Sequence, residues 1–130
     1  MKLTPSENKA LAKFGEDTAV NAYSYNMDGE GPSTIAVYLD ASFHEANSLI
    51  NAGRKIDHAR AAASMKASRH DAELVRLFDE ELAPLESEEE HAISHEQFKR
   101  LDDIRDDMAE VKRRINARLK AIHHHPLYLV

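Results

Sequence analysis

The side chains in this chain that could do chemistry include eight histidines, a run of glutamates and two pairs of aspartates. His91 and His95 stand four residues apart, a spacing that can place two imidazoles beside one metal ion if both lie on one helix. His58 with His123 or His124 forms a second candidate pair if their helices run antiparallel. Histidines in the last turn of a helix also interact favourably with its dipole. We prefer this second interpretation and assign no metal ligand and no cofactor.

The sequence contains little that indicates catalysis. The chain has no glycine-rich phosphate loop and no nucleophile elbow. The pairs Asp102-Asp103 and Asp106-Asp107 recur every four residues beside apolar positions, which is typical of a solvated helix face. Metal sites in helical bundles instead use inward-facing glutamates and Glu-x-x-His pairs. We therefore expect a protein that is not an enzyme and has no catalytic residues.

Composition narrows the class of protein further. The 130 residues are 42% hydrophobic and 31% charged, and the absence of cysteine excludes a disulfide framework and cysteine-based zinc fingers. No apolar run approaches the roughly 18 residues of a membrane helix, and the N-terminus lacks the apolar core of a signal peptide. We expect a cytoplasmic protein without a membrane partner. Residues 70–95 hold nine acidic residues and one basic residue, which argues against non-specific coating of nucleic acid.

The elements that would position these side chains are all helices, so the predicted fold class is all-α. Thr4 to Glu7 forms a capping box that opens a first helix to about Tyr25, and glycines and a proline between Met27 and Pro32 predict a turn. A short helix follows over residues 34–39, and a second capping box begins at Ser42. We expect Gly53 to end that helix and residues 1–54 to form a three-helix module.

The rest of the chain predicts a long antiparallel helical hairpin over residues 55–125. Its arms are expected at about 55–83, closed by Pro84, and 94–124, opened by a third capping box at Ser94. The second arm carries apolar residues at alternating steps of three and four, the pattern of a coiled-coil seam. The predicted hairpin and oligomer seam comprises Leu101, Ile104, Met108, Val111, Ile115 and Ile122. Because a lone hairpin leaves each stripe half exposed, we expect a homo-oligomer, a dimer or higher.

Residues 33–51 combine a short helix, a tight turn and a second capped helix. A small residue stands at the expected crossing, an anchor precedes the turn, a cap follows it and further apolar residues face inward. These positions are Ala36, Leu39, Ser42, Ala46, Leu49 and Ile50. The segment resembles the helix-turn-helix motif of DNA-binding domains. It departs from that motif in Asp40, where glycine is usual, and in Ala46, where a branched residue is usual.

The resemblance implies that the second helix presents side chains to DNA or to another partner. Asparagine and serine can contact base edges, and basic side chains can hold phosphate. The candidate binding residues are His44, Asn47, Ser48, Asn51, Arg54 and Lys55. The helix itself contains no arginine or lysine before Arg54, and Glu45 would repel a phosphate backbone.

The apolar tail Pro126–Val130 is a last candidate. Leu127, Tyr128 and Leu129 must either fold back onto the hairpin or dock on a partner by strand addition.

Three functions remain open on these grounds. The leading hypothesis is a non-enzymatic interaction protein that oligomerises through its hairpin, a DNA-associated regulator or assembly factor. The order of its parts is similar to that of small DNA-packaging or regulatory proteins of phages and plasmids. The alternatives are a protein-binding adaptor or inhibitor that does not contact DNA, and a metal-binding helical bundle.

Overall fold

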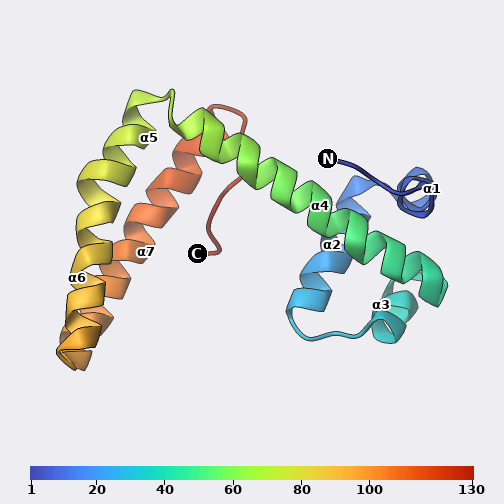
Figure 1. The fold of residues 1–130 in the computed structure, drawn as a ribbon, viewed down its shortest axis with the longest axis horizontal. Helices are drawn as coiled ribbons and strands as arrows, with labels where there is room; N and C mark the ends of the chain where they lie inside the picture. Colours follow the sequence, from blue (N-terminus) through green and yellow to red (C-terminus); the bar gives the residue numbers. More distant parts are fainter. The chain divides into compact units, whose positions relative to one another are not determined.

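The computed structural model describes residues 1–130 and is all-α, without strands. Its helices are α1 (Pro5–Phe14), α2 (Glu16–Met27), α3 (Pro32–Leu39), α4 (Phe43–Ser68), α5 (Ala72–Arg76), the π-helical turn η1 (Leu77–Leu82), α6 (Ala83–Ser94) and α7 (Phe98–Ala121) (Figure 1). They form two compact units, unit 1 (residues 1–59) and unit 2 (residues 60–130), and α4 contributes residues to both. None of the helices combines the length and apolar character that a membrane crossing requires.

The first helix of unit 1 differs from the expected single helix to Tyr25. The Thr4 hydroxyl accepts a hydrogen bond from the Glu7 N–H at 3.2 Å, so the predicted cap is confirmed. The helix then stops at Gly15, whose φ of 89° is open to glycine and strained for other residues, and α2 starts immediately afterwards. The chain therefore turns between two shorter helices that both pack into the core of unit 1.

Gly53 does not end a helix, as its sequence position suggested, but lies buried inside α4. A Cβ at this position would overlap the carbonyl oxygen of Ala19 in α2 and stand 3.0 Å from the Tyr23 Cβ. The glycine therefore permits a backbone-to-backbone approach of α2 and α4, which Ala19, Ala22 and Ala52 extend with fully buried small side chains. Helical propensity is overridden here by tertiary packing.

The turn between α3 and α4 follows the local chemistry of its residues. Asp40 adopts a left-handed conformation, with φ 51° and ψ 49°. The predicted capping box after it is confirmed, because Ser42 and Glu45 exchange hydrogen bonds from backbone N–H to side-chain oxygen, each of 3.0 Å. Ala36 and Ala46 are both buried in the core of unit 1.

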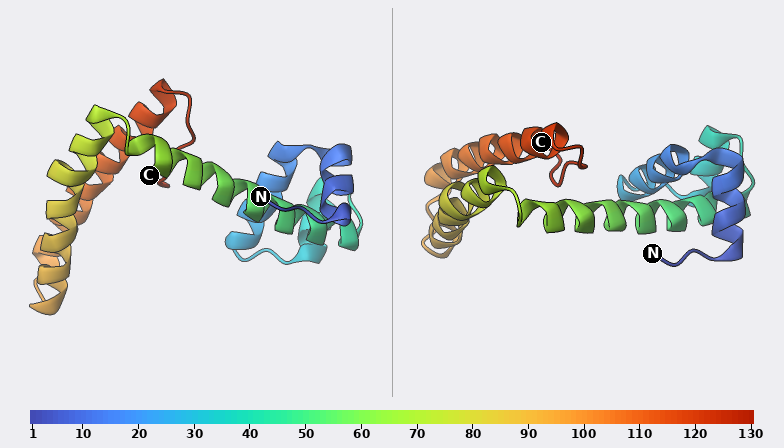
Figure 2. Two further views of the ribbon diagram at one scale, coloured as in Figure 1. Left: turned by 45° about the horizontal axis from the view of Figure 1, so that its top comes forward. Right: turned by 90° about the horizontal axis from the view of Figure 1, so that it is seen from above.

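The hairpin of unit 2 is made of other residues than the sequence predicted. Its first arm is α5, η1 and α6, residues 72–94, and not residues 55–83, since α4 ends at Ser68 and Asp71 caps a new helix through the Leu74 N–H at 3.0 Å. This arm lies beside α7 in both views of Figure 2. The two arms share a core with Leu74, Leu77 and Leu82 on one side and the apolar stripe of α7 on the other.

Pro84 does not close the first arm, because a π-helical turn precedes it. The Ala83 N–H reaches back five residues to the Phe78 carbonyl, and this wide turn brings Leu77 and Leu82, five residues apart, onto the same buried face. The glutamates that follow continue the helix as part of α6. Arginines of α7 offset part of the acidic charge of this arm, since Glu81 in η1 pairs with Arg114 at 2.9 Å and Glu89 in α6 pairs with Arg105 at 3.2 Å.

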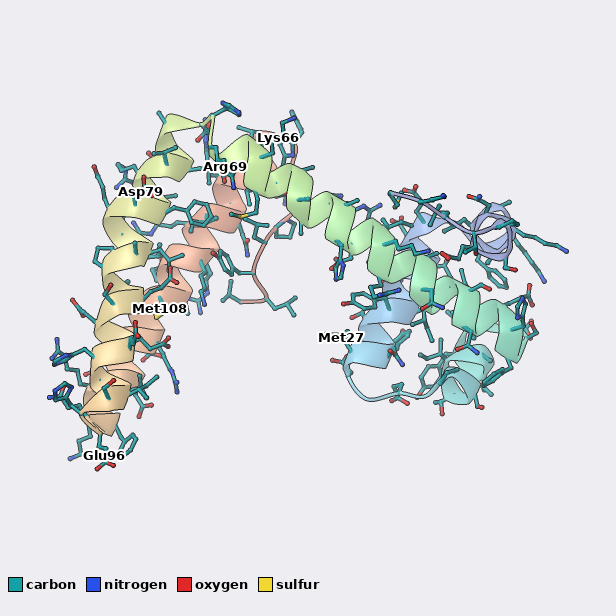
Figure 3. The ribbon with its side chains drawn as sticks, in the orientation of Figure 1. Met27, Lys66, Arg69, Asp79, Glu96 and Met108 are labelled. Carbon is teal, nitrogen blue, oxygen red and sulfur yellow. The ribbon has the colours of Figure 1, made fainter.

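The predicted capping box at Ser94 is also wrong. The Ser94 hydroxyl donates to the Glu90 carbonyl inside α6, and α7 begins only at Phe98. The turn is made by His95 to Gln97, with Glu96 in a left-handed conformation at φ 54°, and Glu96 is labelled there in Figure 3.

Candidate interaction surface

The residues that the helix-turn-helix resemblance singled out do not form one exposed surface. His44, Asn51 and Arg54 are exposed and Asn47 is half-buried, but Ser48 is only 7% exposed and belongs to the interior of unit 1. Ser48 is therefore withdrawn as a contact residue, because its place in the helix turns it toward the other helices of the unit.

Lys55 is likewise engaged within unit 1. Its ammonium group donates to both carboxylate oxygens of Glu7, at 2.6 and 2.9 Å. Burial would raise the pKa of Glu7, but hydrogen bonds from Lys55 and Thr4 outweigh it and hold the pKa below its ordinary value of 4.5. Lys55 thus neutralises a buried carboxylate and is not available to hold phosphate.

Glu45 adds a negative charge to the start of α4. Hydrogen bonds from Lys13 and from the backbone of Ser42 lower its pKa to about 2, so it stays ionised at any physiological pH. The Lys13 ammonium lies 2.8 Å from this carboxylate and offsets its charge, so neither group leaves a free charge beside His44 and Asn47.

Unit 1 instead exposes a set of large apolar side chains. They come from the end of α2, from α3 and from the first residue of α4, and their exposed fractions range from 40 to 80%. The set, called here the aromatic surface, comprises Tyr25, Met27, Val37, Tyr38 and Phe43. Isolated exposed apolar residues are ordinary, whereas aromatic ones from neighbouring helices are typical of interaction surfaces.

Three contacts organise this surface. The rings of Tyr25 and Tyr38 lie 5.4 Å apart at an angle of 60°, a favourable tilted pair that joins α2 to α3. The Tyr38 hydroxyl donates to the Glu30 carboxylate at 3.5 Å, and the Asn26 amide donates to the Glu30 carbonyl at 3.0 Å. Met27, labelled in Figure 3, ends α2 beside this loop. These contacts hold part of the loop between α2 and α3 against the tyrosines.

The charged residues next to the aromatic surface along the chain are acidic. Residues 14–53, which include all of α2 and α3, contain six aspartates and glutamates and no lysine or arginine. Asp28, Glu30 and Asp40 flank the aromatic residues in the chain, and Lys13, from outside this stretch, pairs with Glu45 at 2.8 Å. The excess of carboxylates in this stretch favours a partner of opposite charge.

The predicted seam of α7 is not an exposed surface. Its first five members are buried in the core of unit 2, Leu119 joins them, and Ile122 is half-buried against the same core. The expected surplus apolar edge is covered within the chain by Leu74, Leu77 and Leu82 and by the partly buried Phe78 and Leu85. The α7 residues of the predicted seam therefore pack within unit 2 and leave no free apolar stripe for a second copy.

The C-terminal tail folds back in cis. Leu127 and Tyr128 are half-buried against the core of unit 2, whereas Leu129 is fully exposed. Burial, and to a lesser degree the charge of Glu86, raise the pKa of Tyr128. Leu127 and Tyr128 therefore fold back onto the chain, as one of the two interpretations expected, whereas Leu129 stays exposed.

The histidines do not assemble into a metal centre. His91 and His95 stack with ring centroids 4.0 Å apart, and His95 Nδ1 contacts the His91 carbonyl at 2.9 Å, which uses part of the binding capacity of the pair. His58 packs edge-on against Tyr23 at 6.2 Å. No group of three or more histidine and carboxylate side chains in the chain is arranged to hold a metal ion.

The aromatic surface was missed by the sequence reasoning. Tyr25 lies near the end of α2, and Val37 and Tyr38 lie in a short helix that reads as apolar throughout. A helix that is apolar on every side must expose some of its apolar residues unless it is enclosed. That pattern in residues 34–39 was the available signal. Comparisons with protein-family models, curated proteins and solved structures find no match.

Proposed function

We propose that this chain is a non-enzymatic protein-binding protein whose aromatic surface on unit 1 takes up a basic, amphipathic segment of another protein. The observation that carries the proposal is the exposed set of Tyr25, Val37, Tyr38 and Phe43 within a stretch of forty residues, 14–53, that has carboxylates and no basic side chain. Aromatic side chains supply most of the binding energy in many interfaces, and tyrosine rings also attract arginine and lysine.

A basic segment fits this surface better than the other partners do. A second copy in a symmetric contact would place the carboxylates of Asp28, Glu30 and Asp40 opposite their own equivalents, which is unfavourable. Nucleic acid would be repelled by the same groups. Leucine and arginine on one face of a partner helix would satisfy both the apolar centre and the acidic surroundings.

Binding of duplex DNA through α3 and α4 is a second candidate function. The left-handed Asp40 and the Ser42–Glu45 capping box give these helices the local chemistry of the resembled motif. His44, Asn51 and Arg54 remain exposed on α4 for such a contact. The buried Ser48 and the engaged Lys55 favour the protein-binding function.

The two candidates are separated by one set of titrations. A synthetic amphipathic helix of arginines and leucines is titrated into the isotopically labelled full chain, and amide shifts are followed by NMR. We expect shifts confined to α2, α3 and the start of α4, weakening between 50 and 300 mM salt because the contact is partly electrostatic. A peptide with glutamate in place of arginine should not bind.

Two exposed apolar residues provide matched variants. Val37→Lys places a positive charge in the aromatic surface, and Phe98→Lys makes the same change at an exposed residue of unit 2. Because lysine removes apolar contact and repels a basic peptide, we expect Val37→Lys to weaken peptide binding at least about tenfold, or about 1.4 kcal/mol, and Phe98→Lys to leave it unchanged. Equal binding by all three proteins would contradict the proposal. Retardation of a DNA duplex at low salt, abolished by Arg54→Ala, would establish the second candidate instead.

A further inference from the structure

The C-terminal tail is held by a fork of side-chain atoms rather than by apolar contact alone. Asn116 of α7 accepts hydrogen bonds from the N–H groups of Leu127 and Tyr128, at 3.0 and 3.2 Å, and its amide donates to the Tyr128 carbonyl at 2.8 Å. Ser64 of α4 donates to the His125 carbonyl at 2.7 Å. All of these bonds end on backbone groups of the tail, so they recognise an extended chain and not a particular side chain.

The side chains that contact the tail, Ser64, Lys112 and Asn116, are called here the groove. The Ser64 side chain has no exposed surface, and its hydroxyl is directed at the tail. An occupant that covers this hydroxyl without offering an acceptor leaves it buried and unsatisfied, so an occupant that supplies a carbonyl at this position is favoured. The same holds for the Asn116 amide, which uses both its oxygen and its nitrogen on the tail.

Side-chain contacts add selectivity at two positions. Leu127 and Tyr128 lie against the core of unit 2, and the Lys112 ammonium stands 5.1 Å from the centre of the Tyr128 ring, within range of a cation–π attraction. Leu129 has left the groove and is fully exposed. Recognition therefore covers residues 125–128 and prefers an apolar residue followed by tyrosine.

The tail packs on the outside of unit 2. The buried core consists of residues of α5, η1, α6 and α7, and Leu127 and Tyr128 lie against it as partly buried residues. The connection from the end of α7 contains His123 in a left-handed conformation, with φ 62°, and the His124 N–H closes the helix on the Leu119 carbonyl at 2.8 Å. This helix end is made by residues 119–124, so it does not depend on the contacts of residues 125–128.

We infer that the groove lined by Ser64, Lys112 and Asn116 is a binding site for an extended peptide that carries an apolar residue followed by tyrosine. The chain's own residues 125–128 are its resident occupant, and a partner segment of the same chemistry displaces them. The site lies wholly in unit 2 and is independent of the aromatic surface on unit 1, so each proposal can fail without the other.

The first test empties the groove in the full-length chain. Leu127→Gly with Tyr128→Gly removes the side chains that seat the tail and leaves the backbone length unchanged. A fluorescent peptide with the sequence of residues 124–130 is then titrated into the double variant and into the wild-type chain. We expect the double variant to bind the peptide at least about tenfold more tightly, since the resident tail no longer competes.

Asn116→Ala in the same double variant is the matched control. It removes the fork and keeps the rest of the groove, and we expect it to abolish peptide binding. A peptide with glycine at both the leucine and tyrosine positions should bind none of the proteins. Failure of the double variant to bind the peptide while its helical circular dichroism is retained would overturn the inference, as would equal binding with and without Asn116.

A second measurement decides the question even if the double variant does not fold. The chain has no cysteine, so Leu129→Cys introduces one labelling position at a fully exposed residue and leaves residues 125–128 intact. A fluorophore there reports the mobility of the tail by its anisotropy. We expect a high anisotropy in this protein and a fall on addition of excess peptide, to the value seen when Asn116→Ala is added. An anisotropy that Asn116→Ala leaves unchanged would contradict a held, displaceable tail.

Discussion

Gly53→Ala isolates the feature on which unit 1 most depends, the approach of α2 and α4. In the interior of an exposed helix this substitution stabilises by about 1 kcal/mol, because alanine has the better helical propensity. Here the new Cβ would overlap the Ala19 carbonyl oxygen and lie 2.5 Å from its carbonyl carbon. Local propensity and tertiary packing therefore predict opposite signs for one change.

The magnitude follows from the distance that must be recovered. Ordinary contact begins at 3.4 Å and the Ala19 carbonyl oxygen would lie at 1.9 Å, so the two must separate by about 1.5 Å, along a contact formed by backbone and not by a side chain that could rotate away. Overpacking of this kind costs about 1–3 kcal/mol or more, and the loosened contacts of Ala22 and Ala52 add to it. We expect a net destabilisation of at least about 2 kcal/mol, a large part of the stability of a unit of this size.

Tyrosine fluorescence during urea unfolding measures this effect in unit 1. The chain has no tryptophan, and three of its four tyrosines, Tyr23, Tyr25 and Tyr38, lie in unit 1. Gly31→Ala is the matched control, since a Cβ there meets nothing within 4 Å and φ is not positive. We expect the control to lose no more than about 1 kcal/mol, because alanine is a poorer N-cap than glycine. If Gly53→Ala left the midpoint unchanged or raised it, the packing argument would be refuted.

Two further predictions concern the cores of the two units. Ile104 is 4% exposed in unit 2, and Ile104→Asp should lower the free energy of unfolding by more than about 3 kcal/mol. The control Asp103→Asn, at an exposed residue, should leave it unchanged. A folded Ile104→Asp protein that only lost self-association in sedimentation would show that the seam faces another copy. In unit 1, the folded pKa of Glu7 lies below its unfolded value, so its stabilising contribution is complete above about pH 4.5 and is lost as the pH falls through the folded pKa. Lys55→Met leaves that buried carboxylate without its ammonium partner and should cost on the order of 1–3 kcal/mol at pH 7. Burial then raises the Glu7 pKa, and urea unfolding at pH 4 and pH 7 should show the variant losing the preference for neutral pH that the wild type has.

Local sequence signals predicted local structure well. The Thr4 cap, the Ser42–Glu45 capping box and the turn before Pro32 depend on neighbouring residues, and each is present as expected. The apolar stripe of α7 was identified from its spacing, and its members between the two ends of the regular pattern are all buried, namely Leu101, Ile104, Met108, Val111 and Ile115. These features are decided within about one helical turn, which is the range over which spacing and capping rules act.

The failures at Gly53 and Lys55 have a different cause, since the role of each residue is decided by a distant segment. Those at Gly15, Pro84 and Ser94 are local to their own helices. Gly53 reads as a helix end until the backbone of α2 is placed beside it. Pro84 reads as a helix end until the π-helical turn before it is seen. Lys55 reads as a phosphate ligand until Glu7, 48 residues away, is found to bind it. Sequence spacing along one helix carries no information about such partners.

The expected partner site moves from the α7 seam in unit 2 to the aromatic surface of unit 1. The seam of α7 was expected to be a surface for assembly because a lone hairpin leaves it half exposed, but the chain covers it with η1, α6 and the tail. The large apolar side chains that stay exposed together are those of α2, α3 and the start of α4, where the only neighbouring charges along the chain are carboxylates. If assembly through α7 were the function, polar substitution of Val37 would be silent. If unit 1 binds a basic segment, polar substitution of Val37 weakens that binding. The hairpin then contributes its own stability and the groove that holds residues 125–128.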